Sequence, residues 1–311
     1  MRRPRARAAS AAAGDPTGPW SRRPARDAQA PLLLTREGLP IELSDIGAKV
    51  ISLDDSAAEI ADESVYDLSV TATGDNLAYA IYTSGSTGRP NGVLITQDAL
   101  TKFSLAYSEA LGLRASDRIL QFASPSFDVA LEEIFPTLLC GAAIVFNGGE
   151  RAPDASNLLR VIEPLRITGI ELPTAYWTEW VRDLSARETR LPETLRFVII
   201  GGDKVANKLP AQWQSFGVPL LHAYGVTEAT ITSTIYHLPL SDQAVTDLPL
   251  GTALPRRCRE RDGDGRLAVA ARRGLGDRRG TRRTRSGRCP ARHLAARPGR
   301  RSAPRARPAR A

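Results

Sequence analysis

Short apolar runs alternate with longer amphipathic stretches between about Pro31 and Pro255, and this alternation most limits what the chain can fold into. Apolar runs of about five residues are typical of buried strands, and the stretches between them are long enough for helices. The alternation predicts an α/β fold, with a parallel-rich sheet and helical crossovers. The expected strands are residues 77–82, 118–123, 142–146, 168–172, 195–200 and 218–223.

Helical periodicity is clearest after Thr96, a residue type that caps helix N-termini. Leu100, Phe103, Tyr107 and Leu111 then recur at helical spacing, which predicts a crossover helix with one apolar face. Residues 158–165 repeat this pattern. Further helices are expected at residues 129–139, 174–184 and 206–216, each between two of the apolar runs.

The net charge of +8 is concentrated at the two ends of the sequence. Residues 256–311 contain 20 Arg, no Lys and 4 acidic residues, and residues 1–30 contain 7 Arg and 2 Asp. Residues 31–255 therefore carry a net charge of −13. A negative net charge argues against a nucleic acid as the partner of the folded part.

Both basic ends consist mainly of Arg, Ala, Gly and Pro, without apolar periodicity. They cannot bury enough surface to offset the entropy of ordering. We therefore expect residues 1–30 and 256–311 to be disordered and residues 31–255 to form the folded core. The abrupt change after Pro255 also fits a GC-rich gene read in a shifted frame. The alternative is a genuine basic tail that contacts RNA or a membrane.

The cysteine and hydropathy patterns favour a cytoplasmic protein. Cys140, Cys258 and Cys289 show neither metal-ligand nor disulfide spacing, which fits a reducing compartment. Apolar stretches stay below the roughly 20 residues of a membrane span, and the Arg-rich start leads into no hydrophobic signal region. We therefore expect neither export nor a membrane partner.

A segment rich in glycine and hydroxyl groups directly follows the first expected strand. Residues 83–92 contain three glycines and four Ser or Thr side chains. Glycine lets backbone N–H groups approach a phosphate closely, and hydroxyl groups donate further hydrogen bonds to its oxygens. The segment differs from the G-x-x-x-x-G-K-[ST] loop of P-loop enzymes. Its composition alone also fits a plain linker.

A second polar segment, residues 223–228, follows the last expected strand. Open α/β sheets place their ligands at this edge. Here Tyr224 can stack on a purine, Thr227 can donate to an α-phosphate, and Glu228 can hold Mg²⁺ that bridges phosphate oxygens. A polar turn after a strand is also common without any ligand.

Together the two segments resemble signature motifs of the adenylate-forming superfamily, which includes acyl-CoA synthetases, luciferases and the adenylation domains of nonribosomal peptide synthetases. The phosphate loop is matched by L-A-Y-A-I-Y-T-S-G-S-T-G-R-P-N-G-V, and the N-x-Y-G-x-T-E motif by A-Y-G-V-T-E. Asn91 stands where the family usually has Lys, so one cation for the phosphates is lost, although Arg89 lies nearby. Val226 replaces the usual Pro, and His222 is expected to be structural.

The resemblance implies a division of roles at an ATP site. Thr227 and Glu228 would act in catalysis, and Glu228 would be the Mg²⁺ ligand. Gly201, Gly202 and Asp203 are similar to the family's loop beside adenine. The residues implied in ATP binding are Thr83, Ser84, Gly85, Ser86, Thr87, Gly88, Gly202, Asp203, Tyr224 and Thr227.

A third segment, S-F-D-V-A-L-E-E-I-F at residues 126–135, places three acids before an apolar helix face. By itself it also fits helix capping and a solvated face. In peptide-synthetase adenylation domains the Asp of this segment pairs with the α-ammonium group of the amino acid, which the resemblance implies for Asp128. The resemblance further implies a side-chain pocket lined by Val129, Glu132, Glu171, Ile199, Gly201, Ala223, Ile231 and Thr232.

Two of these pocket residues, Glu132 and Glu171, are acidic. A carboxylate in a pocket is costly unless it is paired, so two of them favour a cationic ligand. We therefore expect a basic amino acid substrate, similar to ornithine or lysine.

The resemblance implies that the amino-acid carboxylate attacks the α-phosphorus of ATP, giving aminoacyl-AMP and pyrophosphate. The acyl group would then pass to the phosphopantetheine thiol of a peptidyl carrier protein domain. The resemblance covers residues 32–255, so we expect the domain to be truncated at both ends, without the C-terminal subdomain that supplies a Lys. Two alternatives stay open: a non-catalytic fragment that at most binds nucleotide, and a scaffold that uses the fold for protein contacts.

Overall fold

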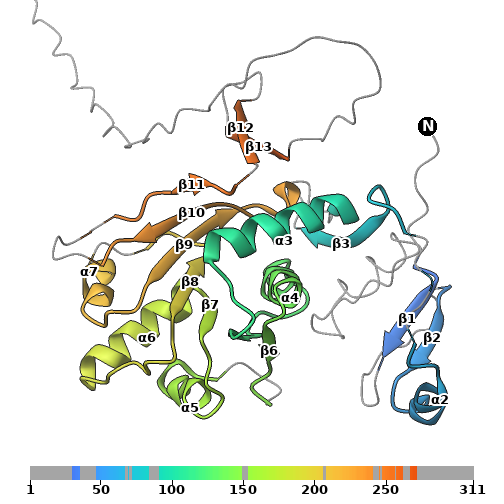
Figure 1. Ribbon diagram of the computed structural model, residues 1–311, viewed down its shortest axis with the longest axis horizontal. Coiled ribbons are helices and arrows are strands. Elements are labelled where there is room, and N and C mark those ends of the chain that lie inside the picture. The colour runs from blue at the N-terminus through green and yellow to red at the C-terminus, as the bar shows by residue number, and fades with distance from the viewer. Residues whose placement is uncertain are drawn as a thin grey trace, which may run out of the picture. The chain divides into compact units, whose positions relative to one another are not determined.

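The computed structural model describes residues 30–35, 47–66, 69, 72–83, 91–148, 153–205, 208–240, 245, 247–255, 257–261 and 267–271. All of them belong to one compact unit, Met1–Arg272. Its main feature is a seven-stranded sheet with the order β11-β10-β9-β8-β7-β5-β6 (Figure 1). The strands are β5 (Arg118–Leu120), β6 (Ala143–Val145), β7 (Gly169–Pro173), β8 (Phe197–Gly201), β9 (Leu220–Gly225), β10 (Thr232–Leu238) and β11 (Thr252–Ala253).

Strands β6, β5, β7, β8 and β9 run parallel, and β10 and β11 are antiparallel to their neighbours. Helical crossovers connect the parallel strands through α4 (Val129–Leu139), η1 (Ala155–Asn157), α5 (Leu159–Ile162), α6 (Thr174–Ala186) and α7 (Leu209–Gln214). The expected α/β fold with a parallel-rich sheet is therefore confirmed. Five of the six expected strands are in this sheet.

The remaining expected strand, at residues 77–82, is β3 (Leu77–Thr83) and lies outside the main sheet. It pairs antiparallel with β4 (Asn91–Thr96) in a separate two-stranded sheet. Three smaller elements precede this hairpin: β1 (Leu32–Thr35) and β2 (Lys49–Ser52), which pair in parallel, and α2 (Ala57–Asp62).

The longest helix of the described chain, α3 (Gln97–Leu111), begins after Thr96, the predicted cap. The Thr96 hydroxyl oxygen accepts a hydrogen bond from the Ala99 N–H at 3.2 Å, which satisfies one free donor of the first turn. Gly112 ends the helix in the left-handed conformation, with φ 57°, which glycine adopts without steric cost. The other expected helices are present, but α5 and α7 are shorter than residues 158–165 and 206–216.

The main sheet buries its two faces in two separate hydrophobic clusters. Alternate residues of one strand point to opposite faces, so Val198 and Ile200 of β8 join one cluster, and Phe197 and Ile199 join the other. The first cluster contains the inner faces of α5, α6 and α7, including Trp177, Trp180 and Trp213. The second contains the apolar face of α3 and the residues that the β3–β4 hairpin turns inward. Figure 1 shows α3 and α4 on one side of the sheet and α5, α6 and α7 on the other.

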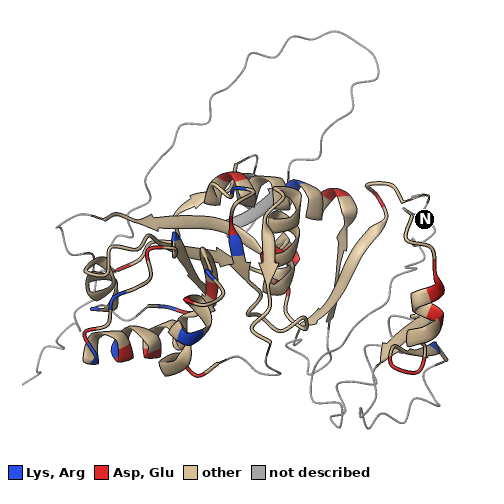
Figure 2. Cartoon of the chain, turned by 60° about the horizontal axis from the view of Figure 1, so that its bottom comes forward, with Lys and Arg blue, Asp and Glu red and all other residues tan. Residues whose placement is uncertain are grey.

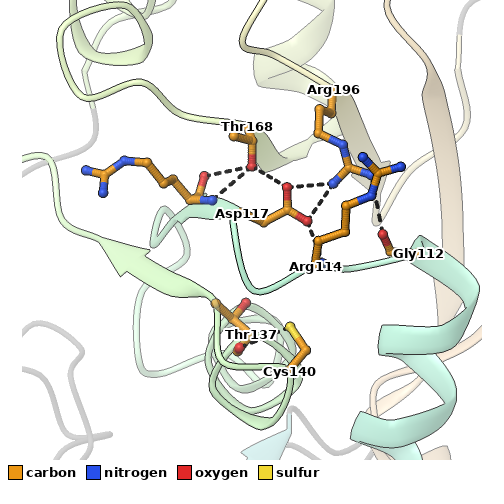
Figure 3. A network of polar contacts seen from close by, with 8 residues as sticks. Gly112, Arg114, Asp117, Thr137, Cys140, Thr168 and Arg196 are labelled. Atoms are coloured by element: carbon orange, nitrogen blue, oxygen red, sulfur yellow. Dashed lines mark hydrogen bonds and ion pairs between the residues drawn. The ribbon is translucent and has the colours of Figure 1, made fainter.

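A buried ion pair links the amino ends of the parallel strands. Asp117, just before β5, is 1% exposed and accepts from Arg196, just before β8, at 2.6 and 2.5 Å (Figure 3). Thr168, just before β7, donates to the same carboxylate at 2.9 Å. The backbone N–H of Arg114 donates at 2.8 Å. The carboxylate is thus paired and fully hydrogen-bonded, which is the condition under which a buried charge is tolerated.

Two expectations fall largely on residues that the structure does not describe. Within residues 1–30, only Ala30 is described, and it is buried. Within residues 256–311, ten residues form an antiparallel hairpin of β12 (Arg257–Arg261) and β13 (Leu267–Ala271), where disorder is expected from the sequence. The division of the chain at residues 30 and 255 stays a prediction.

Candidate functional site

The carboxyl ends of β7, β8 and β9 lie side by side at one edge of the sheet. Pro173 at the end of β7 pairs with Gly201 at the end of β8. A Cβ atom at Gly201 would lie 3.1 Å from the carbonyl oxygen of Ala223 in β9, so the two strand ends approach closely. Gly202 follows with φ 92°, a conformation that favours glycine. Gly202 and Asp203 are exposed beyond the end of β8.

The second motif leaves the neighbouring strand at the same edge. Tyr224 is the penultimate residue of β9 and is 46% exposed. Thr227 and Glu228 form a short 3₁₀ turn, η2 (Thr227–Ala229), in which Glu228 is exposed. Gly225 permits the return of the chain, because a Cβ there would overlap the backbone carbonyl of Ile231. The segment therefore offers an aromatic ring, a hydroxyl and a carboxylate beside the strand ends.

The residues that flank the expected phosphate loop lie opposite each other at the end of the β3–β4 hairpin. Thr83 pairs with Asn91, and its hydroxyl donates to the Asn91 carbonyl at 3.5 Å. Strand β4 packs against η2, which carries Thr227 and Glu228. The other expected loop residues, Ser84, Gly85, Ser86, Thr87 and Gly88, lie outside the described residues.

The expected pocket residues come from α4 and from the face of the sheet that α3 covers. Asp128 and Val129 are half-buried where α4 begins, and Gly201 is half-buried at the end of β8. Glu171 of β7 pairs in register with Ile199 of β8, so the two side chains are neighbours on one face. The fully buried members of the set are Glu132, Glu171, Ile199, Ala223, Ile231 and Thr232.

The pocket contains a buried acidic cluster. Glu132 is 2% exposed and Glu171 is 7% exposed. Thr232 donates to Oε1 of Glu132 at 3.1 Å, and Tyr107 donates to Oε2 of Glu171 at 3.2 Å. Oε2 of Glu132 is buried, and the described residues give it no hydrogen-bond partner. Three of the expected pocket residues, Glu132, Glu171 and Ile199, also line a small cavity beside α3, and none of the described residues that line this cavity is Lys, Arg or His.

Burial dominates the electrostatics of these carboxyl groups. Desolvation raises the pKa of Glu132 to about 7, although hydrogen bonds from Glu171 and Thr232 partly oppose the shift. Desolvation and the nearby Glu132 charge raise the pKa of Glu171 well above its ordinary value. The described residues that line the cavity offer no cation to compensate the charged forms.

Glu133, adjacent to Glu132, has a structural role that the sequence pattern does not reveal. Its carboxylate accepts from the backbone N–H groups of Phe122 and Ala123 at 3.0 to 3.2 Å and from the side-chain amide of Gln121 at 3.2 Å. It thus fixes the loop between β5 and α4. Burial raises the pKa of Glu133 to about 8, and the Glu171 charge adds to the increase.

The turn into β10 is strained beside the pocket. Thr230 has φ 64° and Ile231 has φ 62°, a region that β-branched residues rarely adopt. Such conformations concentrate at ligand sites, where the surrounding structure holds them. Here the turn delivers Ile231 and Thr232 to the buried side of the sheet.

Comparison with known proteins identifies the family. The family model described as AMP-binding enzyme matches residues 22–265. The chain belongs to the AMP-binding enzyme family. The resemblance to adenylate-forming enzymes is thereby confirmed.

The relatives of this AMP-binding chain include large synthetases. An isonitrile lipopeptide synthase of Streptomyces coeruleorubidus is 34% identical over 246 residues, which are 78% of this chain and 17% of that protein. The nonribosomal peptide synthetase FmoA3 shares the fold, with a TM-score of 0.72 and 23% identity over 82% of this chain and 28% of that chain. The N-terminal subdomain of Klebsiella oxytoca NpsA, in complex with anthranilyl-AMSN, has a TM-score of 0.64 and 26% identity, covering 78% of this chain and 62% of that chain. This chain therefore spans a small part of the curated synthase.

Figure 2 shows basic and acidic residues interspersed along the helices of the described chain. In the part of the chain that the structure describes, none of the helices is both long and apolar enough to cross a membrane. Within the same residues, no group of three or more His, Cys, Asp or Glu side chains forms a preformed metal site.

Proposed function

We propose that this chain is the nucleotide- and substrate-binding core of an amino-acid adenylation domain whose substrate has a cationic side chain. The observation that carries the proposal is the buried pair of Glu132 and Glu171 in a cavity without a described basic lining residue. Two buried carboxyl groups whose charged forms repel each other favour a ligand that brings the missing positive charge. Ornithine and lysine have this chemistry.

The nucleotide would bind at the carboxyl edge of β8 and β9. Tyr224 is exposed enough to stack on adenine beside Gly202 and Asp203, and Thr227 would donate to the α-phosphate. Residues Thr83 to Gly88 would wrap the β- and γ-phosphates, which the packing of β4 against η2 supports. NpsA, the Klebsiella oxytoca neighbour in complex with anthranilyl-AMSN, supports an adenylate-like ligand for this fold.

Glu228 fits the expected role of a magnesium ligand. Mg²⁺ in nucleotide sites commonly takes one or two protein carboxylates, together with phosphate oxygens and water. Glu228 is a single exposed carboxylate, so it does not need a preformed protein cluster. When bound, the ion would neutralise charge on the phosphates.

The amino acid would enter with its α-ammonium group on Asp128 and its side chain toward Glu132 and Glu171. Its carboxylate would then face the α-phosphate held by Thr227. In-line attack of this carboxylate on the α-phosphorus would form aminoacyl-AMP and release pyrophosphate. Such a reaction needs positioning and charge neutralisation more than covalent help from the protein. The product would pass to the phosphopantetheine thiol of a peptidyl carrier protein.

Binding of matched amino acids to the purified full chain tests the substrate class. We expect ornithine or lysine, with Mg·ATP, to raise the melting temperature, while norleucine, the uncharged analogue of lysine, does not. Glu171→Gln should remove this preference without lowering the affinity for Mg·ATP alone. A preference of the unaltered chain for norleucine would contradict the proposed substrate.

The same measurements separate the alternative functions. Circular dichroism and a cooperative thermal transition report whether the chain folds. A folded chain that ignores Mg·ATP would support a scaffold, and the absence of a cooperative transition would support a non-functional fragment. Either result would overturn the proposed nucleotide site.

A further inference from the structure

Tyr107 has a polar contact that its position on the helix does not predict. It lies on the apolar face of α3, is 1% exposed and stacks on Phe103 with ring centroids 5.3 Å apart. Its hydroxyl reaches across to β7 and donates to Oε2 of Glu171 at 3.2 Å. A purely apolar core position would be filled as well by Phe, so the hydroxyl serves the contact with Glu171.

We infer that Tyr107 positions the Glu171 carboxylate for the cationic side chain of the substrate. This inference rests on the proposed function. Tyr107 is outside the set of pocket residues indicated by the sequence motifs. It acts through Glu171, because its hydroxyl donates to the Glu171 carboxylate and Tyr107 itself is 1% exposed.

The groups around Glu171 explain why a donor is needed there. Burial raises the pKa of Glu171, and the charges of Glu132 in α4 and of Asp128, just before α4, add to the increase. Glu133 of α4 also interacts electrostatically with Glu171. From α3, the Tyr107 hydroxyl favours the charged form of Glu171 by donating to it. The hydroxyl of Thr232 in β10 donates to Glu132.

Tyr107 itself stays protonated and can donate throughout the physiological range. Burial raises the pKa of Tyr107 well above its ordinary value, and the charges of Glu132, Glu171 and Glu133 add to the increase. The hydroxyl is therefore a fixed donor to the Glu171 carboxylate. The hydrogen bond holds one carboxylate oxygen and opposes its protonation, which prepares it for a cation.

The test is Tyr107→Phe in the full chain, because this change removes the hydroxyl and leaves the stacking on Phe103. Hydrogen bonds to charged groups contribute enough that we expect affinity for ornithine to fall about tenfold or more. The affinity for Mg·ATP should not change. Loss of the donor should also move the acid limb of ornithine binding to higher pH, a change that a merely structural role would not produce.

Tyr176→Phe is the matched control. The Tyr176 hydroxyl donates to the Pro153 carbonyl at 2.6 Å, and the ring packs against Phe122. This variant also loses one tyrosine hydrogen bond, but at a place outside the acidic cavity. It should leave both the affinity for ornithine and its pH profile unchanged.

Carboxyl titration of the ligand-free protein by NMR tests the inference independently of the substrate. We expect Glu171 to titrate at higher pH in Tyr107→Phe than in the unaltered chain. If Glu171 titrates identically in both, the inference is wrong whatever amino acid binds. If the titration shifts but the unaltered chain prefers norleucine, the proposed substrate class is wrong and Tyr107 still positions Glu171.

Discussion

The Thr232 hydroxyl donates to Oε1 of Glu132 at 3.1 Å, although the two residues are 100 positions apart in the sequence. The contact ties β10 to α4 across the pocket. Burial raises the pKa of Glu132, and this hydrogen bond opposes the increase because it favours the charged form. This pair therefore links the stability of the fold to the charge of the pocket.

Thr232→Val tests this link. The variant keeps the shape of the side chain but leaves Oε1 of Glu132 without its donor, which should lower the free energy of unfolding by about 1–3 kcal/mol. Urea unfolding measures the change. Thr101→Val on the exposed face of α3 is the control, since its hydroxyl donates only to the Gln97 carbonyl of its own helix. Equal losses in both variants would contradict the prediction.

The pH dependence of stability should reveal the buried acids. The folded-state pKa of Glu133, about 8, lies above its ordinary value of 4.5, so the folded chain binds more protons between these pH values. The contribution of the Glu133 carboxyl group to the free energy of unfolding is fully present below pH 4.5 and is lost as the pH rises through about 8.

Glu133→Gln should therefore gain stability relative to the unaltered chain as the pH rises. The limiting slope is about 1.4 kcal/mol per pH unit for one proton. Urea unfolding from pH 5.5 to 8.5 measures it, and the comparison cancels the opposite contribution of His222, whose pKa burial lowers. Parallel pH profiles for the two proteins would show that Glu133 titrates normally.

The ion pair of Asp117 and Arg196 should be among the most sensitive polar contacts in the described fold. Asp117→Ala leaves the Arg196 guanidinium and the Thr168 hydroxyl without their shared acceptor, and we expect a loss of about 3–5 kcal/mol. Asp98→Ala removes the Asp98–Lys102 pair, which is half exposed, and should cost no more than about 0.5 kcal/mol. Similar losses of unfolding free energy in the two variants would show that burial does not determine how much an ion pair contributes to stability.

Removal of the proposed magnesium ligand should change nucleotide binding but not stability. Glu228→Gln alters an exposed side chain, so its free energy of unfolding should stay within about 0.5 kcal/mol. The part of ATP affinity that depends on Mg²⁺, measured with and without EDTA by calorimetry, should fall. Glu179→Gln, an exposed acid on α6, is the control. Unchanged Mg²⁺ dependence in Glu228→Gln would exclude this residue as the ligand.

The strands of the parallel sheet could be predicted because they are continuous apolar runs. Strand β10 could not be predicted in this way, because Thr232, Ser233 and Thr234 are polar in sequence although all three are buried. Their burial follows from the position of β10 between β9 and β11, which is a tertiary property. Strand β4 is likewise absent from the sequence prediction, since half of its residues are polar or glycine.

Sequence motifs indicated the candidate site where its residues are consecutive in the chain. Residues 223–228 indicated a site at the strand end, and the structure brings their strand beside Gly201. Tyr107 and Glu133 gave no such signal. Tyr107 has the spacing of a core residue, and Glu133 has that of an acid on a helix surface. Only the three-dimensional packing reveals their hydrogen-bond partners.

Glu171 stands between Ile170 and Leu172, which both pack in the tryptophan-rich cluster on the opposite face of the sheet. A slip of β7 by a single residue would turn the carboxylate toward the tryptophans and the two aliphatic side chains toward Tyr107. Misaligned chains would thus lose the hydrophobic interior and the proposed substrate pocket at the same moment. Correct strand register and the proposed recognition of the substrate therefore depend on the same three consecutive residues.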